Sequence, residues 1–353
     1  CGKSTLMRQH VGPTIDEAFY LNFDTPKLFR FDIKDFELLD LLIDETGKRN
    51  LYFDEIQVVE GWELYVRQKL DQRFNVCITG SNASLLSREL GTKLTGRHIS
   101  KELYPLSYKE FLRFRSLTPC AESFMEYLRD GGFPEFVRTG NQDVLTALFD
   151  DILYRDIAVR YGIRDVVSLK ALLLYLAANF GNLASANKLA GMVGIKTGKT
   201  ALEYLSYFEE AYFISRMPKF SWSLKAQYVN PQKIYFIDTA LSQAVTVSFT
   251  GNTGHMLENV VYWELRRRYR QLYYFSENNS ECDFVVCEKN VPILLIQVCL
   301  ELHRENESRE VGGLREAMRF FKKDKGILIT LNQEDKIRAE EGWIDVIPVH
   351  QFV

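Results

Sequence analysis

The sequence predicts an α/β protein that begins with a mostly parallel sheet wrapped by helices and ends in two further modules. Apolar strand-like runs alternate with segments of helical spacing up to residue 107, which favours parallel strands joined by crossover helices. Helical spacing alone continues to residue 181, and short strand-like runs return afterwards. The expected domains are therefore residues 1–107, 108–181, 182–250 and 251–353.

Composition indicates a soluble globular protein rather than one adapted to a membrane or a polyanion. The 353 residues carry a net charge of −3, with 26% charged residues. No apolar run reaches the roughly 18 residues of a membrane span. The six cysteines form no C-x-x-C pair, which favours reduced thiols over disulfides or zinc. We therefore expect a cytoplasmic protein.

The first five residues contain the second half of a phosphate-binding loop, in which Gly2 and Lys3 precede Ser4 and Thr5. Backbone N–H groups and the lysine of such a loop hold the β- and γ-phosphates of a nucleotide, and the hydroxyl after the lysine binds Mg²⁺. A complete loop needs a glycine five residues before Gly2, so the sequence is expected to begin inside its own motif. The alternative is an ordinary capped helix N-terminus.

A second motif follows the apolar run at Leu51 to Phe53, which ends in Asp54 and Glu55. A buried strand delivers such acids to the carboxyl edge of a parallel sheet. Beside a phosphate-binding loop, Asp54 is expected to hold Mg²⁺ and Glu55 to polarise the attacking water. A strand followed by a solvated acidic turn is the alternative.

A third motif is the run from Asn75 to Asn82, a strand that ends in small polar residues. Ser81 or Asn82, on the strand beside the acids, is expected to sense the γ-phosphate or orient the lytic water. The alternative is a plain turn made by Gly80, Ser81 and Asn82.

Together these motifs resemble the AAA+ ATPases, and in particular a bacterial and archaeal family with a C-terminal domain of uncharacterised function and a restriction-endonuclease-like core. The resemblance covers nearly the whole chain and implies ATP and Mg²⁺ as ligands. It also implies that residues 108–181 form a helical lid over the nucleotide. The stretches that carry it are LYFDEIQVVEGWE, VCITGSNASLLSRELGTKLTGRHISKELYPLSYKEFL, GGFPEFV, GHMLENVVYWELRRR and ECDFVV.

Arg97 matches an arginine in the T-G-R motif of that family. There it could neutralise a γ-phosphate of its own subunit, or of a neighbouring subunit in a homo-oligomer. The alternative is an ion pair with a carboxylate. The residues that follow, His98 to Leu103, are expected to form another short strand.

Residues 182–250 predict a winged-helix outline, with two helices separated by a turn at Gly194 and followed by a hairpin. If this module bound DNA, Lys196 and Lys199 would stand near phosphates at the start of the second helix. The surrounding glutamates leave little basic surface, so contact with a protein partner is the alternative.

The C-terminal domain is expected to place Glu258 on a helix and Asp283 at a strand start. Restriction-endonuclease-like nucleases use such acids for Mg²⁺, together with an acid-x-lysine on the next strand. Here that position reads Gln297-Val298-Cys299, so we expect a degenerate nuclease in which Glu258, Asp283 and Gln297 are remnants.

The run Arg266, Arg267 and Arg268 could hold a nucleic-acid backbone, or it could be a solvated helix face. These observations lead to three functional hypotheses. The first is an ATP-hydrolysing enzyme that moves its C-terminal modules, and the second is a nucleotide-gated switch that binds DNA or a protein with little turnover. The third, an ATP-dependent nuclease, is the least favoured because of Gln297 and Cys299.

Overall fold

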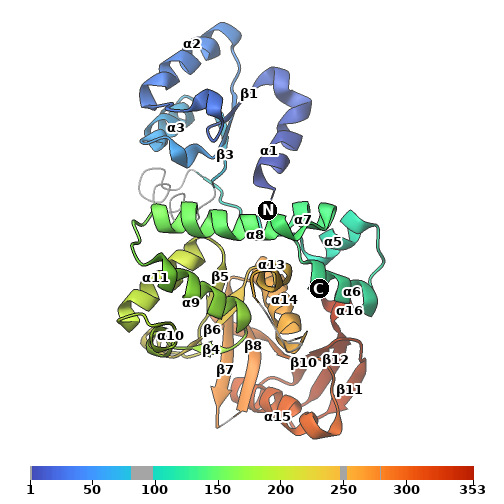
Figure 1. Ribbon diagram of the computed structural model, residues 1–353. Coiled ribbons are helices and arrows are strands. Elements are labelled where there is room, and N and C mark those ends of the chain that lie inside the picture. Colours follow the sequence, from blue (N-terminus) through green and yellow to red (C-terminus); the bar gives the residue numbers. More distant parts are fainter. Residues whose placement is uncertain (1, 81–97, 247–252, 279) are drawn as a thin grey trace. The chain divides into compact units, whose positions relative to one another are not determined.

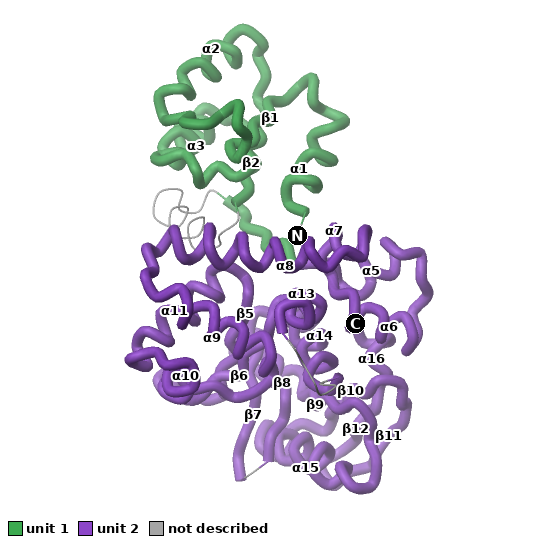
Figure 2. The backbone as a smooth tube through the Cα atoms, viewed as in Figure 1, with its two compact units in different colours: residues 1–104 green, residues 105–353 purple. Residues whose placement is uncertain are grey.

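The chain folds into two units, residues 1–104 and residues 105–353 (Figures 1 and 2). A computed structural model describes residues 2–80, 98–246, 253–278 and 280–353. The boundary between the units lies close to the predicted domain boundary at residue 107. Because residues 105–353 form one compact unit, the boundaries predicted at 181 and 250 stay predictions. Among the described residues, no helix is both long and apolar enough to cross a lipid bilayer.

Unit 1 contains a parallel sheet of three strands in the order β1-β2-β3. The apolar runs of the sequence predict these strands to within a residue or two, and the strands end in register, with Asn22 beside Asp54. The strands are β1 (Ala18–Asn22), β2 (Asn50–Asp54) and β3 (Asn75–Ile78), and the helices are α1 (Lys3–Val11), α2 (Phe36–Thr46) and α3 (Trp62–Asp71).

Helices cover both faces of this sheet, as strand alternation requires when both faces are buried. Leu51 and Phe53 of β2 point to one face and are fully buried against apolar side chains of α2 and α3. Tyr52 points to the other face and packs with Met7 and Val11 of α1. This packing fixes α1 beside the strand that ends in the two acids.

The strand predicted from His98 to Leu103 does not form, and this prediction is wrong. The segment has no buried face, because its apolar residues Ile99 and Leu103 are exposed to solvent. Two apolar side chains among polar neighbours bury too little surface to hold a strand against a sheet.

Unit 2 begins with a run of helices that the helical spacing predicts. Ser107 caps the first of them, and Glu110 completes the capping box by accepting from the Ser107 backbone. The helices are α5 (Tyr108–Arg115), α6 (Ala121–Asp130), α7 (Pro134–Thr139), α8 (Gln142–Asp151), which continues as a π-helix over Ile152–Val159, and α9 (Val166–Ala178).

The glycine pair Gly131-Gly132 makes the turn between α6 and α7. Gly131 has a φ of +61°, and a Cβ there would lie 2.3 Å from Oδ1 of Asp238. A Cβ on Gly132 would lie 2.3 Å from the carbonyl oxygen of Leu106. Only glycine lets the backbone approach both groups this closely.

A small antiparallel sheet follows, in the order β4-β6-β5. Gly194 ends α10 with a φ of +74°, and the Thr197 hydroxyl caps α11 by accepting from the Thr200 N–H. The strands are β4 (Leu183–Ala184), β5 (Ile214–Met217) and β6 (Gln232–Phe236), and the helices are α10 (Ala186–Val193), α11 (Gly198–Glu210), α12 (Leu224–Val229) and α13 (Thr239–Val245).

The C-terminal part of unit 2 is a mixed sheet of six strands in the order β11-β12-β10-β9-β8-β7. Leu314, Ala317 and Met318 of α15 pack into the core on one face of this sheet. Its elements are α14 (Thr253–Arg268), β7 (Gln271–Glu277), β8 (Ser280–Glu288), β9 (Val291–Val298), α15 (Arg304–Phe321), β10 (Lys325–Thr330), β11 (Asp335–Arg338), β12 (Trp343–Pro348) and α16 (Val349–Phe352).

Candidate functional site

The N-terminus of α1 is built to receive an anion. Gly2 precedes the helix in the left-handed conformation, with a φ of +86°, and Lys3, Ser4 and Thr5 form the first turn. The first N–H groups of a helix have no acceptor within it and carry a partial positive charge. With no acidic residue in this turn, these groups and the Lys3 ammonium favour a phosphate.

Asp54 lies at the end of β2, fully buried, with its carboxylate held by two hydroxyl groups. The Tyr20 hydroxyl of β1 donates to Oδ2 at 2.9 Å, and the Thr79 hydroxyl donates to Oδ1 at 2.5 Å. Tyr20 in turn accepts from Nε of Arg8 in α1 at 3.1 Å. The acid therefore has a fixed orientation at the carboxyl edge of the sheet.

Glu55, which directly follows β2, forms an ion pair with Lys3 of α1. Its carboxylate lies 3.8 Å from the Lys3 ammonium, and the two side chains are 18% and 28% exposed. The backbone of Glu55 is left-handed, with a φ of +54°, which is uncommon for a residue other than glycine. The predicted phosphate-binding lysine and the predicted acids thus share one edge of the sheet.

Thr79 is a residue of this edge to which we assigned no role from the sequence. Its hydroxyl donates to Asp54 and also accepts from the Glu55 N–H at 3.2 Å. The signal was available, because Thr79 directly follows β3 and parallel strands end at one edge. The sequence instead pointed to Ser81, Asn82 and Arg97, which lie outside the described residues.

The hydroxyl and carboxylate oxygens at this edge are of the kinds that bind Mg²⁺ in proteins. Within residues 2–80, 98–246, 253–278 and 280–353, no three His, Cys, Asp or Glu side chains are grouped to hold a metal. Mg²⁺ in nucleotide enzymes commonly takes one or two protein ligands, with water and phosphate oxygens completing the shell. Ser4 and Asp54 are the residues that would supply such ligands here.

Comparison with known proteins agrees with this geometry. Residues 1–112 match the family described as an AAA domain, and residues 121–252 and 253–352 match two domains of unknown function, DUF8612 and DUF4143. The uncharacterised protein MJ1544 of Methanocaldococcus jannaschii is 34% identical over 94% of this chain and 81% of its own length. The chain belongs to the same family of AAA-domain proteins.

Two further relatives of this AAA-domain protein are also uncharacterised. One, from Haemophilus influenzae, is 31% identical over 93% of this chain and 86% of its own length. The other, MJ1637 of Methanocaldococcus jannaschii, is 25% identical over the whole chain and 82% of its own length. The similarity therefore extends well beyond the AAA domain, and none of these names states an activity.

The DUF4143 region brings Glu258 and Asp283 together, around a lysine that sequence reasoning missed. Lys233 of β6 lies 3.0 Å from Oε1 of Glu258 and 2.8 Å from Oδ1 of Asp283. Burial and the neighbouring charge of Asp283 raise the pKa of Glu258, although Lys233 opposes that shift. No local sequence pattern could have predicted the role of Lys233, because it is 25 residues from Glu258 and 50 residues from Asp283.

Gln297 and Cys299 do not complete a nuclease site. The Gln297 amide accepts from the Asp283 N–H at 3.1 Å and donates to Oε2 of Glu310 at 2.8 Å, so it links β8 to α15. Burial raises the pKa of the Cys299 thiol to about 12, which keeps it protonated and unreactive. Both side chains are explained by packing and hydrogen bonding.

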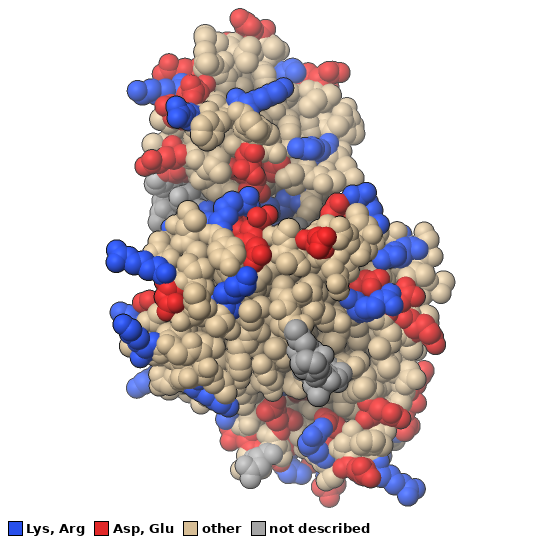
Figure 3. Space-filling model, viewed as in Figure 1, with Lys and Arg blue, Asp and Glu red and all other residues tan. Residues whose placement is uncertain are grey.

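The basic residues singled out from the sequence have different surroundings. Lys196 and Lys199 are exposed at the start of α11. Arg267 donates to the Pro105 carbonyl, and Arg268 donates to Glu264 and to the Phe352 carbonyl. Charges of both signs are interspersed on the face of unit 2 seen in Figure 3. The arginine run, in which Arg266 is partly buried, therefore serves the fold of unit 2 at least in part.

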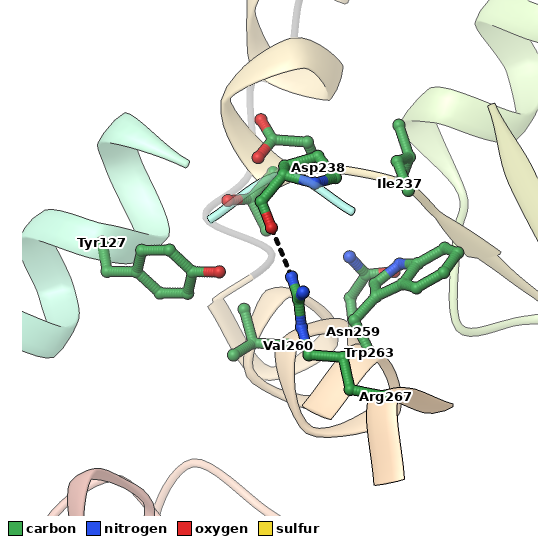
Figure 4. A pocket seen from close by; sticks show the side chains of 9 residues that line it. Tyr127, Ile237, Asp238, Asn259, Val260, Trp263 and Arg267 are labelled. Carbon is green, nitrogen blue, oxygen red and sulfur yellow. Dashed lines mark hydrogen bonds between the residues drawn. The ribbon is translucent and has the colours of Figure 1, made fainter. Parts of the chain in front are cut away.

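A small polar cavity of about 20 Å³ lies where Asp238, Asn259 and Arg267 converge (Figure 4). Asp238 caps α13 and also accepts from the Gly132 N–H at 2.6 Å. Burial raises the pKa of Asp238 to about 6. This volume suits a single water molecule, so the cavity has the size of a structural water site.

Proposed function

We propose that this protein binds and hydrolyses ATP and uses the nucleotide state to move modules of unit 2. The main support is the 3.8 Å approach of Lys3 to Glu55, because it joins a helix N-terminus to the acids at the end of β2. In this proposal Gly2, Lys3 and Thr5 bind phosphate, and Lys3 exchanges its ion pair with Glu55 for a phosphate oxygen.

Asp54 and Glu55 have different roles in this proposal. Bound Mg²⁺ would neutralise the charge on the phosphates during transfer. Ser4 and Asp54 would hold the ion, and Tyr20 and Thr79 already fix the Asp54 carboxylate in place. Glu55 would accept a proton from the attacking water once its carboxylate leaves Lys3, while Gln57 Nε2 donates to its Oε2 at 2.6 Å. Ser81, Asn82 and Arg97 are proposed to sense or stabilise the γ-phosphate.

The test is ATP turnover and nucleotide binding by the full-length protein and its Lys3→Ala and Glu55→Gln variants. Lys3→Ala should lose both binding and turnover. Glu55→Gln should retain binding while turnover falls about 100-fold, since general-base catalysis contributes roughly that much or more. Lys34→Ala and Glu60→Gln remove exposed charges from the same unit and serve as matched controls.

Equal turnover in the wild type and both site variants would contradict the proposed roles. A loss shared by Lys34→Ala and Glu60→Gln would point to general charge effects instead. Nucleotide binding measured in parallel separates a failure to bind ATP from a failure to hydrolyse it.

For unit 2 we infer a winged-helix-like module over residues 182–250 and a restriction-endonuclease-like domain over residues 251–353. The pair α10 and α11, joined by the turn at Gly194, supports the first inference. The placement of Glu258 on α14 beside Asp283 on β8 supports the second. Nuclease activity is not proposed, because Gln297 and Cys299 are used in packing.

The second candidate function is a nucleotide-gated switch that binds DNA with little turnover. The observation behind it is that Lys196 and Lys199 are both exposed at the start of α11, where they could contact phosphates. DNA retention that requires ATP, weakens with salt and is lost in a Lys196→Ala/Lys199→Ala variant would support it. Retention unaffected by these substitutions would rule out α11 as the contact.

A further inference from the structure

Lys233 is the centre of a charged cluster inside unit 2. Its ammonium lies 2.7 Å from Oε1 of Glu281, in addition to its contacts with Glu258 and Asp283. The lysine side chain is only 4% exposed. A buried ammonium is strongly disfavoured unless charged partners surround it, so this arrangement is specific.

The acids are held in place from outside the cluster. The Tyr235 hydroxyl donates to Oε1 of Glu258 at 2.7 Å, and the Val298 N–H donates to Oδ2 of Asp283 at 2.9 Å. Gln297 accepts from the Asp283 backbone. The carboxylates therefore converge on one point because both the surrounding fold and the lysine orient them.

Among the described residues these acids do not form a metal site as they stand, and the cation at their centre is an ammonium group. Three carboxylate oxygens lie within 2.7 to 3.0 Å of Nζ. Divalent ions take such oxygens at about 2.0 to 2.6 Å, so a shift of about half an ångström would suit a metal at the same point. One ammonium also leaves a surplus of negative charge, which a divalent ion would reduce further.

His255 lies near Glu258 at the edge of this cluster. Its Nδ1 is buried and has no hydrogen-bond partner among the described residues. A Cβ built on Gly181 would lie 2.7 Å from this nitrogen and 3.6 Å from Oε2 of Glu258. The imidazole nitrogen and the second oxygen of Glu258 therefore border the same small space.

We propose that Lys233 takes the place of a metal ion in this cluster and fastens β6 to α14 and β8. The wild-type protein then binds no divalent cation here. Replacing Lys233 by a small neutral residue opens a divalent-cation site formed by Glu258, Glu281 and Asp283.

The test is Mn²⁺ binding without nucleotide, measured by electron paramagnetic resonance on full-length protein. Wild type and Asp283→Asn should bind Mn²⁺ equally. Lys233→Ala should gain a site at least about tenfold tighter than any in the wild type, and Asp283→Asn on that background should remove it. Lys233→Arg retains a positive charge, so it should gain no site.

Two outcomes would overturn the proposal. One is Mn²⁺ bound by the wild type and lost in Asp283→Asn, and the other is folded Lys233→Ala without a new site. If Lys233→Ala does not fold without metal, Mn²⁺ added during refolding should restore the fold, because the ion supplies the missing positive charge. Failure of Mn²⁺ to restore the fold would equally refute the proposal.

Discussion

Each unit pairs a lysine with carboxylates, but the two sites differ in burial and in distance. Lys3 of unit 1 is 28% exposed and lies 3.8 Å from one carboxylate. Lys233 of unit 2 is 4% exposed and lies within 3.0 Å of three. A loosely paired, accessible lysine can exchange its partner for a ligand, whereas a buried and fully surrounded one cannot. The same residue types are thus suited to binding in one unit and to holding the fold together in the other.

The largest effect should follow from Lys233→Met, which keeps the volume of the side chain and removes its charge. Three carboxylates would then share a buried space with no positive charge, at a cost of about 3 to 5 kcal/mol. Hydrogen exchange by mass spectrometry should show the loss of protection in peptides of β6, α14 and β8. Unchanged exchange in these elements would show that the cluster does not stabilise unit 2.

The next effect concerns Asp238, a buried acid of unit 2 outside the Lys233 cluster. Because burial raises its pKa from 3.8 to about 6, the folded protein binds the proton more tightly than the unfolded chain. Its contribution to stability therefore increases as the pH falls from 7 to 4 and is lost as the pH rises through 6. Two units of pKa correspond to about 3 kcal/mol.

The measurement for Asp238 is the stability difference between wild type and Asp238→Asn at several pH values. Since other acids titrate in both proteins, their contribution cancels in the difference. The free energy of unfolding of the wild type, relative to that of the variant, should increase by about 3 kcal/mol as the pH falls from 7 to 4. Parallel pH curves would mean that Asp238 is not buried as the structure places it.

The contrast between the two sites also shows what the sequence could predict. The position of Asp54 and Glu55 at the end of a strand could be predicted because an apolar run before two acids is a local pattern, and a parallel sheet brings strand ends together. Glu258 and Asp283 were expected to share a site, and they do. Lys233 was missed because its partners come from elements distant in sequence. The strand expected over residues 98–103 does not form because its apolar residues Ile99 and Leu103 are exposed and give the segment no buried face.

Thr79→Val should have an intermediate effect that sharpens the assignment of Asp54. The substitution keeps the shape of the side chain but removes the hydroxyl that holds the buried carboxylate. A hydrogen bond to a charged group contributes about 1.5 to 3 kcal/mol, so ATP turnover should fall about tenfold or more. Thr46→Val, at an exposed position at the end of α2 in the same unit, is the control. Equal ATP turnover in both variants would show that the Thr79 hydroxyl does not contribute to the reaction.

The smallest effect on stability should come from Lys3→Met, the same substitution that is most damaging at Lys233. An exposed ion pair contributes about 1 kcal/mol or less, so unit 1 should retain its hydrogen-exchange protection. ATP binding should nevertheless be lost, because the phosphates lose their charged partner. If the Lys3→Met protein unfolds, Lys3 is a structural residue like Lys233. A stable variant that still binds ATP normally would show that Lys3 does not contribute to nucleotide binding. Only a stable variant that has lost ATP binding would support a binding role for Lys3 and a structural role for Lys233.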